Sequence, residues 1–327
     1  MFRLSIILPC YNVENYIIKC LNSLFKQDIP ESEYEIICVD DCSTDKTCKI
    51  IQQCQKAHPS LRLLHLNENS GCGVARKKGL ESAGGNYIWF IDPDDYILEN
   101  VMSELLKRAE NNRLDIAIFN YKRTVEEMGV VEDVKKVYHD SEVCDGYTFL
   151  DKYCNKRIGD HSIVWLQLYS REFLTQNHIQ YPSLRISSDA LFSWEALFKA
   201  KRVQSESKAR YIYRANRNSV TANIYSSKKI FVTSIESAYE ICELGKRIHI
   251  RSDYNDKLYL AACSDMEDLF KRYKYLSLNQ RKELWKLFRD SEKLKYVYKL
   301  VGMKKRIVLL SRYASFLVFN MLMKSIK

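Results

Sequence analysis

The chain has 327 residues, of which 46% are hydrophobic and 28% charged, so we expect a folded core and one large domain plus an appendage. Its 11 cysteines are odd in number and include no C-x-x-C pair or matching histidine cluster, which argues against a disulfide framework and a zinc site. Free thiols fit a reducing cytoplasm. No small-residue cleavage site follows the first apolar segment, so we expect no signal peptide.

The net charge of +10 is unevenly distributed along the chain. Residues 225–327 contain 22 Lys and Arg against 11 Asp and Glu, whereas residues 1–224 contain 29 against 30. The basic excess therefore belongs to the C-terminal part. A basic surface of this kind is typical of proteins that contact nucleic acid or an anionic membrane.

Strand and helix patterns alternate over the first third of the chain. Helical spacing of apolar residues predicts three helices and a fourth that follows Ser43 and Thr44, its candidate N-caps. This order indicates an α/β fold with a doubly wound, mainly parallel, Rossmann-like sheet, in which ligands bind beyond the carboxyl ends of the strands. The predicted strands are 4–9, 35–40, 61–66, 87–91 and 115–120, and the other three helices are 13–27, 73–83 and 101–111.

The regular pattern weakens between residues 125 and 145, where we expect an insert that is either mobile or a hairpin, and then resumes. Beyond Tyr225 the pattern is helical throughout. The last segment, 307–327, is apolar but is interrupted by Arg312 and Asn320, which argues against a membrane span. It suits an interfacial amphipathic helix, and packing against the rest of the protein or a second subunit explains it equally well.

Three carboxylates follow the fourth predicted strand in the sequence Asp92-Pro93-Asp94-Asp95. One interpretation is a solvated β-turn, because Pro and Asp are favoured in turns. The other is a site for Mg²⁺ or Mn²⁺, ions that prefer oxygen ligands and complete their shell with water and phosphate. Asp94 is the first candidate ligand, Asp92 lies beside it, and Asp95 fits either interpretation.

Asp40 and Asp41 follow the second predicted strand, a position at which an acidic side chain often recognises a nucleoside. Asp41 and Asp45 also fit the N-terminus of the next helix, where acidic residues are favourable. The first strand is followed by "PCYNVEN", which is neither the G-x-G-x-x-G of dinucleotide-binding proteins nor a GxxxxGK[ST] phosphate loop. A nucleotide would therefore have to be held in another way.

Four segments, in order, resemble a known family: "LSIILPCYNVENYIIKCLNSLFKQ", "EIICVDDCSTDKT", "NSGCGVARKKGLESAGGNYIWFIDPDD" and "RISSDALFSWEALFKAKRV". Over residues 3–220 the chain resembles a family 2 glycosyltransferase of the GT-A fold, of the kind that builds bacterial cell-surface polysaccharides. The resemblance implies inverting transfer of a sugar from a nucleotide diphosphate donor, usually a UDP-sugar, to an acceptor hydroxyl, with Mn²⁺ or Mg²⁺. We expect a transferase domain at 1–224, with a nucleotide-binding half at 1–120 and an acceptor half at 121–224, and a basic helical extension at 225–327.

The resemblance also implies roles for individual residues. Asp92 and Asp94 match the family's D-x-D, in which the second Asp ligates the metal, and Asp40 matches the carboxylate that contacts the base. For Arg76 the alternative is a solvated surface arginine. For Arg214 and Arg217, which lie where the family has a loop over the donor diphosphate, the alternative is an exposed basic loop. The positions carried over as nucleotide-contacting are Pro9, Tyr11, Glu14, Asp40, Arg76, Asp92, Arg214 and Arg217.

The resemblance also implies that Asp189 is the catalytic base. An inverting displacement needs such a carboxylate to take the proton of the acceptor hydroxyl. Local sequence alone favours Asp189 as a cap of the helix that follows it, and the resemblance reverses this preference. The chain departs from the family at Ser188, where Glu is usual, and at Lys77, where Asn is more frequent. Leu166 and Gln167 stand where Asn and Lys are common. These departures leave the donor sugar and the acceptor open.

The implied partners are a nucleotide-sugar donor, a saccharide or lipid-linked acceptor and, through the C-terminal helix, an anionic membrane surface or a second copy of the chain, but not nucleic acid. The implied location is the cytoplasm or the inner face of the cell membrane. Two alternatives stay open. A sugar-phosphate nucleotidyltransferase should carry a Gly/Arg/Lys-rich loop after the first strand. An inactive module would bind nucleotide sugars or lipid without turnover.

Overall fold

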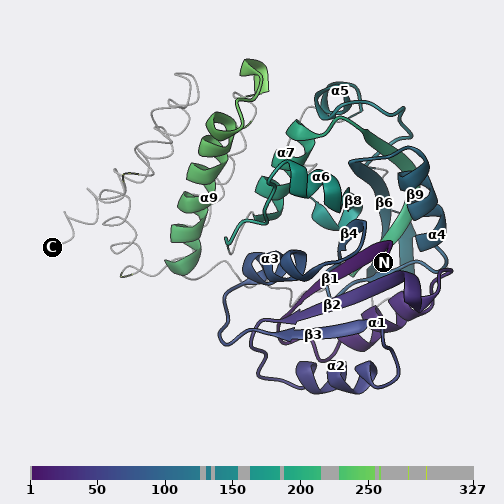
Figure 1. Cartoon of the computed structure of the whole chain (residues 1–327). Coiled ribbons are helices and arrows are strands. Elements are labelled where there is room, and N and C mark those ends of the chain that lie inside the picture. Colours follow the sequence, from purple (N-terminus) through teal and green to yellow (C-terminus); the bar gives the residue numbers. More distant parts are fainter. Residues whose placement is uncertain are drawn as a thin grey trace. The chain divides into compact units, whose positions relative to one another are not determined.

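The computed structural model describes residues 2–125, 130–133, 137–153, 163–184, 188–214 and 228–254, with the single positions 258, 279 and 292. The chain divides into two compact units, Met1–Arg217 and Asn218–Lys327, and the described part of the second contains the long helix α9, Lys228–Arg247 (Figure 1). Within the described ranges, no helix is both long and apolar enough to cross a bilayer. The predicted helix at 307–327 lies outside the described residues.

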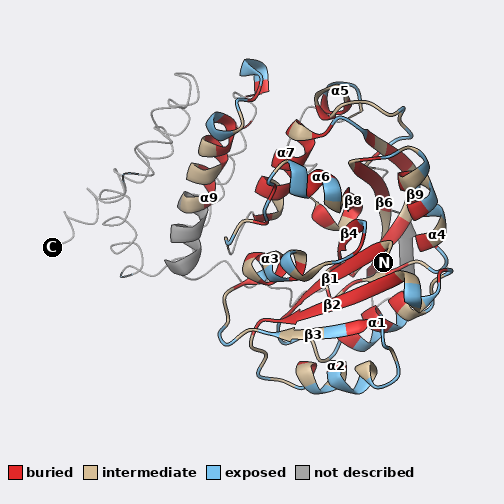
Figure 2. Ribbon diagram, in the orientation of Figure 1, coloured by how far each residue is buried: buried red, intermediate tan, exposed pale blue. Residues whose placement is uncertain are grey.

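The first half of the sheet is parallel and has the strands that the sequence predicted. β1 (Leu4–Cys10) lies between β2 (Tyr34–Asp40) and β4 (Tyr87–Phe90), and β3 (Leu61–His65) pairs with the other side of β2. All residues of β1 and β2 are buried (Figure 2), as expected of parallel strands that are covered on both faces. The predicted α/β architecture is confirmed.

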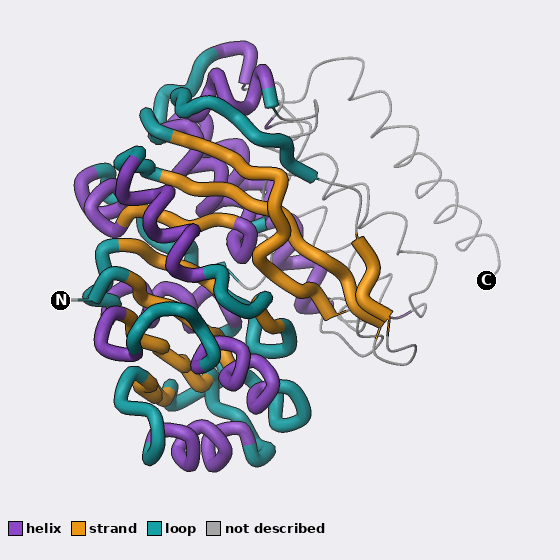
Figure 3. The backbone as a smooth tube through the Cα atoms, turned by 90° about the vertical axis from the view of Figure 1, so that its right-hand side faces the viewer, coloured by secondary structure: helices purple, strands orange, loops and turns teal. Residues whose placement is uncertain are grey.

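The second half of the sheet is mixed, and Figure 3 shows the strands side by side between helices. β8 (Gln167–Ser170) is antiparallel to β4 and to β6 (Ile116–Val125), and β9 (Val203–Arg214) is parallel to β6. The short β5 (Tyr96–Ile97) ends the order β3-β2-β1-β4-β8-β6-β9-β5. β7 (Val130–Asp133) pairs antiparallel with β6, so a hairpin occupies part of the predicted insert.

Helices cover both faces of the sheet. α3 (Cys72–Ser82) packs on β1 and β2 from one side, and α1 (Ile17–Phe25) and α2 (Thr47–Gln55) lie on the other (Figure 1). Ser43 and Thr44 are not the N-caps of α2, because this helix begins later and the Asp45 carboxylate accepts a hydrogen bond from the N–H of Thr47 at 2.9 Å. The other described helices of the first unit are α4 (Met102–Asn111), α5 (Gly146–Lys152), α6 (Arg171–Gln176) and α7 (Ser188–Lys199), with 3₁₀ turns at Glu31–Glu33 and Val164–Leu166.

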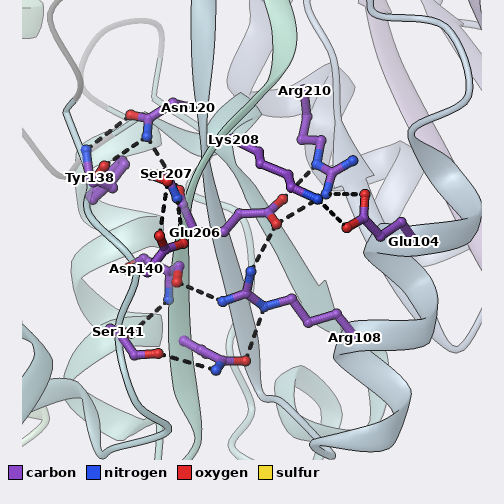
Figure 4. Close-up of polar contacts among 12 residues, drawn as sticks. Glu104, Arg108, Asn120, Tyr138, Asp140, Ser141, Glu206, Ser207, Lys208 and Arg210 are labelled. Atoms are coloured by element: carbon purple, nitrogen blue, oxygen red, sulfur yellow. Dashed lines mark hydrogen bonds and ion pairs between the residues drawn. The ribbon is translucent and has the colours of Figure 1, made fainter.

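An ion-pair network fastens β9 to α4 (Figure 4). Glu206 of β9 accepts hydrogen bonds from Arg210 at 2.6 and 3.0 Å and from Arg108 of α4 at 2.8 Å. Arg210 also donates to Glu104 of α4 at 2.8 Å. Because Glu206 and Arg210 are both buried, each charge needs the other to offset the loss of hydration. The network therefore holds β9, whose last residues reach the candidate site.

Candidate active site

Polar residues gather where the parallel strands end. Tyr11 follows β1, Asp40 is the last residue of β2, and Asp92 follows β4 by two residues. Parallel strands bring their carboxyl ends to one edge of the sheet, which is where ligands bind in sheets of this kind. The Tyr11 side chain is exposed and Asp40 is fully buried, so this edge combines an open aromatic ring with a desolvated carboxylate.

The Asp92–Asp95 segment forms a β-turn. The N–H of Asp95 donates to the carbonyl oxygen of Asp92 at 3.0 Å, and Pro93 takes the second position, where its fixed φ is favoured. The sequence interpretation as a turn is therefore correct, but the turn is only partly exposed to solvent. Asp95 is 1% exposed and Asp92 and Asp94 are partly buried, so the three carboxylates need separate explanations.

Asp95 has two partners on β9. Its Oδ2 accepts from the Tyr211 hydroxyl at 2.7 Å and its Oδ1 accepts from the N–H of Arg214 at 2.7 Å. Burial, followed by the nearby charges of Asp94 and Asp92, raises its pKa well above the usual range. Asp95 thus anchors the end of β9 to the turn, and these hydrogen bonds favour a structural role for it.

Asp94 has no hydrogen bond or ion pair within the described part of the chain. Burial, with the Asp92 charge as the second cause, raises the pKa of Asp94 to about 6, so the group is ionised at neutral pH. Asp92 uses Oδ1 to accept from Arg76 at 2.6 Å and has no described partner on Oδ2. Asp94 has no partner among the described residues, and neither has Oδ2 of the nearby Asp92, an arrangement that fits a hard divalent cation.

Arg76 connects the D-x-D turn to Asp189. Its Nη1 donates to Asp189 Oδ1 at 2.8 Å and its Nη2 donates to Asp92 Oδ1 at 2.6 Å. The residue is only 4% exposed, so the alternative of a solvated surface arginine is wrong. Its Nε–H has no acceptor among the described residues. One guanidinium thus brings together Asp189, which is 113 positions from Arg76 in the sequence, and Asp92, which is 16 positions from it.

The start of α3 sets the position of Arg76. The Asp41 carboxylate accepts from the N–H groups of Ser70 and Gly71 at 2.7 and 2.8 Å, which stabilises the helix N-terminus. At Gly73 a Cβ atom would lie 2.3 Å from the carbonyl oxygen of Leu184, so only glycine allows this approach. The Asp41 carboxylate therefore stabilises the start of α3. The alternative sequence interpretation placed it instead at the start of α2, the helix that follows it in the sequence.

Asp189 is the second residue of α7, and this helix is almost wholly buried. Besides Arg76, its Oδ1 accepts from the Tyr181 hydroxyl at 2.6 Å and from the Ser188 hydroxyl at 3.3 Å. The position in the first turn agrees with the capping interpretation, because an acidic side chain is favourable there. One partner of the carboxylate, Arg76, also binds Asp92 of the D-x-D turn, which agrees with a functional role.

Asp40 lies in a small cluster with Cys48 and His65. Its Oδ2 is 2.7 Å from His65 Nδ1, and Cys48 Sγ is 3.8 Å from the same nitrogen. The three ligand atoms lie within 4.8 Å of one another, a spacing that the sequence pattern could not reveal. Burial, followed by Asp40, raises the pKa of the Cys48 thiol to about 12, so the unliganded thiol keeps its proton at neutral pH and can donate a hydrogen bond. We therefore interpret the cluster as hydrogen-bonded support for Asp40.

The other predicted nucleotide contacts differ in setting. Pro9 is a buried residue of β1, and Glu14 is partly exposed, with its carboxylate accepting from the N–H of Lys46 at 2.9 Å. Arg214 is 4% exposed and its guanidinium carbon lies 5.0 Å from the ring centre of Tyr16, so it is not part of an exposed loop. Arg217 lies outside the described residues.

Two tyrosines of the site had no signal in the sequence. Tyr181 contacts Asp189, and Tyr211 accepts from the N–H of Asp92 at 3.2 Å while donating to Asp95. Both are fully buried, as core aromatic residues usually are. A tyrosine looks the same in sequence whether its hydroxyl contacts the core or a catalytic group, so only the tertiary contacts identify these two residues.

Glycosyltransferases are the class of protein that the chain resembles. The chain belongs to glycosyl transferase family 2, whose family model matches residues 5–176. Poly(ribitol-phosphate) β-N-acetylglucosaminyltransferase TarS of Staphylococcus aureus strain Mu50 is 33% identical over 219 residues, which are 66% of this chain and 36% of TarS. The chain thus spans about a third of the length of this relative.

Solved structures share the fold. A crystal structure of S. aureus TarS 1–349 in complex with UDP-GlcNAc matches with a TM-score of 0.57 and 22% identity over 90% of each chain. The mannosyltransferase PcManGT of Pyrobaculum calidifontis, in complex with GDP-Man and Mn²⁺, matches with a TM-score of 0.53 and 16% identity over 91% of this chain and 84% of its own. The expected GT-A fold is therefore confirmed.

Proposed function

We propose that the chain is an inverting, metal-dependent glycosyltransferase that moves a sugar from a UDP-sugar to a hydroxyl of a cell-surface polysaccharide precursor. The observation that carries the proposal is the arrangement at Arg76, which binds both Asp189 and the Asp92 of the D-x-D turn. Its support from relatives is that TarS is named for the transfer of N-acetylglucosamine to poly(ribitol-phosphate) and that TarS 1–349 was crystallised with UDP-GlcNAc.

The donor side of the site would be formed by the sheet edge. Asp94 and Asp92 would hold Mn²⁺ or Mg²⁺, which when bound neutralises charge on the departing diphosphate. The positive charge of Arg214 partly opposes the rise that burial causes in the pKa of Asp94. Arg214 therefore lies near the carboxylates of the D-x-D turn. The nucleoside would be bound by Pro9, Tyr11, Glu14 and Asp40, and the diphosphate by Arg76, Arg214 and Arg217.

Asp189 would act as the base. The acceptor oxygen attacks the anomeric carbon while its proton passes to the Asp189 carboxylate, and the electron pair of the broken bond leaves with the diphosphate. Attack on the face opposite to the leaving group inverts the anomeric configuration. The acceptor would be a saccharide or a lipid-linked saccharide.

The test is a transfer assay with a panel of UDP-sugars in Mn²⁺, combined with NMR of the product. We expect Asp189→Asn to lower kcat about 100-fold or more, because general-base catalysis contributes factors of this size. We expect the new linkage to have the configuration opposite to that of the donor. Wild-type rates in Asp189→Asn would overturn the base assignment, and a retained configuration would overturn the inverting mechanism.

One observation favours a second function, an inactive module that binds nucleotide sugars. Arg76 already forms ion pairs with both Asp92 and Asp189, so each carboxylate has a cationic partner without a substrate. Calorimetric titration with UDP distinguishes the two functions: metal-dependent affinity without turnover on a broad donor and acceptor panel supports the module. A nucleotidyltransferase has less support, since "PCYNVEN" after β1 contains no Gly/Arg/Lys-rich loop.

A further inference from the structure

The two oxygens of the Asp189 carboxylate have different surroundings. Three donors converge on Oδ1: the Tyr181 hydroxyl at 2.6 Å, Arg76 Nη1 at 2.8 Å and the Ser188 hydroxyl at 3.3 Å. Oδ2 has no hydrogen-bond partner in the described part of the chain. Among the described residues, one oxygen therefore has three donors and the other has none. The shortest of the three contacts comes from the Tyr181 hydroxyl, which has no part in the proposed donor site.

The Tyr181 side chain has little freedom to turn away from Asp189. It is 1% exposed, and its ring stacks on Phe192 with centres 4.7 Å apart and an interplanar angle of 24°. Phe90 of β4 packs 5.0 Å from the same ring, and the guanidinium of Arg76 lies 5.6 Å from its centre. The ring is thus held between α3, β4 and α7, with its hydroxyl directed at the carboxylate.

Burial also keeps the hydroxyl a donor. Desolvation, with the Asp189 charge adding to it, raises the pKa of Tyr181 well above its ordinary value, so the phenol keeps its proton at neutral pH. A charge-assisted hydrogen bond of this length is among the strong ones in proteins. A packing role for the ring requires no hydroxyl, because Phe would fill the same space.

We propose that Tyr181, together with Arg76, is a positioning residue that fixes Asp189 Oδ1 and presents Oδ2 to the acceptor hydroxyl. The inference rests on the proposed role of Asp189 as base. In the reaction, Oδ2 takes the acceptor proton, the acceptor oxygen forms its bond to the anomeric carbon, and the bond to the diphosphate breaks with its electron pair. A fixed carboxylate makes this geometry available without a search of side-chain rotamers.

The decisive variant is Tyr181→Phe, which keeps the ring and removes only the hydroxyl. We expect kcat to fall about 10-fold or more, because a hydrogen bond to a charged group is lost. We expect the KM for the UDP-sugar and the affinity for UDP to change less than about twofold, because the hydroxyl does not touch the donor side.

Tyr169→Phe is the matched control. Tyr169 is also fully buried, packs on the same Phe192 and loses a hydroxyl that donates to Gln167 at 2.8 Å, not to Asp189. We expect its kcat to stay near the wild-type value. A double variant separates positioning from packing: in an Asp189→Asn background, Tyr181→Phe should cost little further activity, because the group that it positions is already lost.

Two results would overturn the inference. One is a wild-type kcat in Tyr181→Phe while Asp189→Asn is inactive, which leaves the proposed function intact. The other is a wild-type kcat in Asp189→Asn, which overturns the proposed role of Asp189 as base as well. If Tyr181→Phe does not fold, Ser188→Ala removes another donor to Oδ1: a lower kcat at an unchanged donor KM supports the inference, and an unchanged kcat overturns it.

Discussion

Three aspartates within one turn have different roles because their partners differ. Asp92 is bound by Arg76, Asp94 has no described partner, and Asp95 holds the end of β9 through Tyr211 and the backbone of Arg214. Like charges in one turn repel each other, so each needs a separate compensation. Arg76 supplies it for Asp92, and hydrogen bonds supply it for Asp95. For Asp94 we propose a divalent cation.

Substitution of Asp94 should therefore affect metal-dependent UDP affinity, whereas substitution of Asp95 should affect the stability of the fold. We expect Asp94→Asn to abolish the contribution of Mn²⁺ to UDP affinity and to leave the melting temperature unchanged or higher, because a buried charge without a partner is removed. We expect Asp95→Ala to lower the free energy of unfolding by about 2–4 kcal/mol, because two buried donors lose their acceptor. Calorimetry and chemical denaturation measure the two effects. Equal effects of both variants on UDP affinity would contradict the division of roles.

The next prediction concerns the close approach of α3 to residues 181–184. A Cβ at Gly73 would lie 2.3 Å from the Leu184 carbonyl oxygen and 2.6 Å from that of Pro182. We expect Gly73→Ala to destabilise the fold by about 1–3 kcal/mol through overpacking and to lower kcat, because it moves Tyr181 and Arg76 apart. The control is Gly84→Ala, whose Cβ would meet its nearest atom, Glu35 Oε1, at an ordinary 3.5 Å. Equal stability of the two variants would show that α3 can shift at little cost.

At the element scale, the pairing of β9 with α4 depends on a buried charge network. We expect Glu206→Ala to lower the free energy of unfolding by about 3–5 kcal/mol, because it leaves Arg210 buried without its main partner. Glu104→Ala is the control at the exposed end of the same network, where the side chain is 53% exposed and we expect a loss of about 0–1 kcal/mol. Urea denaturation of both variants tests this difference, and similar losses would contradict a special role of burial.

At the scale of the whole molecule, the two compact units separate the site from the basic part of the chain. All described site contacts lie within Met1–Arg217, whereas Asn218–Lys327 carries 22 Lys and Arg against 11 Asp and Glu. We propose that the second unit attracts the protein to an anionic membrane surface, where a lipid-linked acceptor would be found. This division assigns the chemistry and the membrane contact to different parts of the sequence.

Removal of residues 218–327 tests the division. We expect the chain 1–217 to keep its Mn²⁺-dependent UDP affinity within about threefold and to lose binding to vesicles that contain anionic lipid, because attraction to such lipid scales with the number of basic residues. Calorimetry and vesicle co-sedimentation measure the two properties, with neutral vesicles as the control. Retained vesicle binding by 1–217 would place the membrane contact in the first unit.

The sequence by itself determined the alternation of elements and the parallel half of the sheet, because buried parallel strands appear as continuous apolar runs whose ends are marked by polar residues. It also placed Asp40, Asp92, Asp94 and Asp189 at element ends. It did not determine β5, since two residues form a strand only when β9 is beside them. The sequence predicted where the strand of residues 87–91 ends, but not which groups contact the three carboxylates that follow it.

Only the tertiary structure decided which groups meet. Arg76 was assigned to the nucleotide by resemblance, and the fold places it between Asp92 and Asp189. Tyr181 and Tyr211 resemble core residues in sequence. Only the structure shows that their hydroxyls donate to Asp189 and Asp95. The physical reason is that periodicity records which face of an element is buried. Contact between residues more than a hundred positions apart depends on how those faces pack.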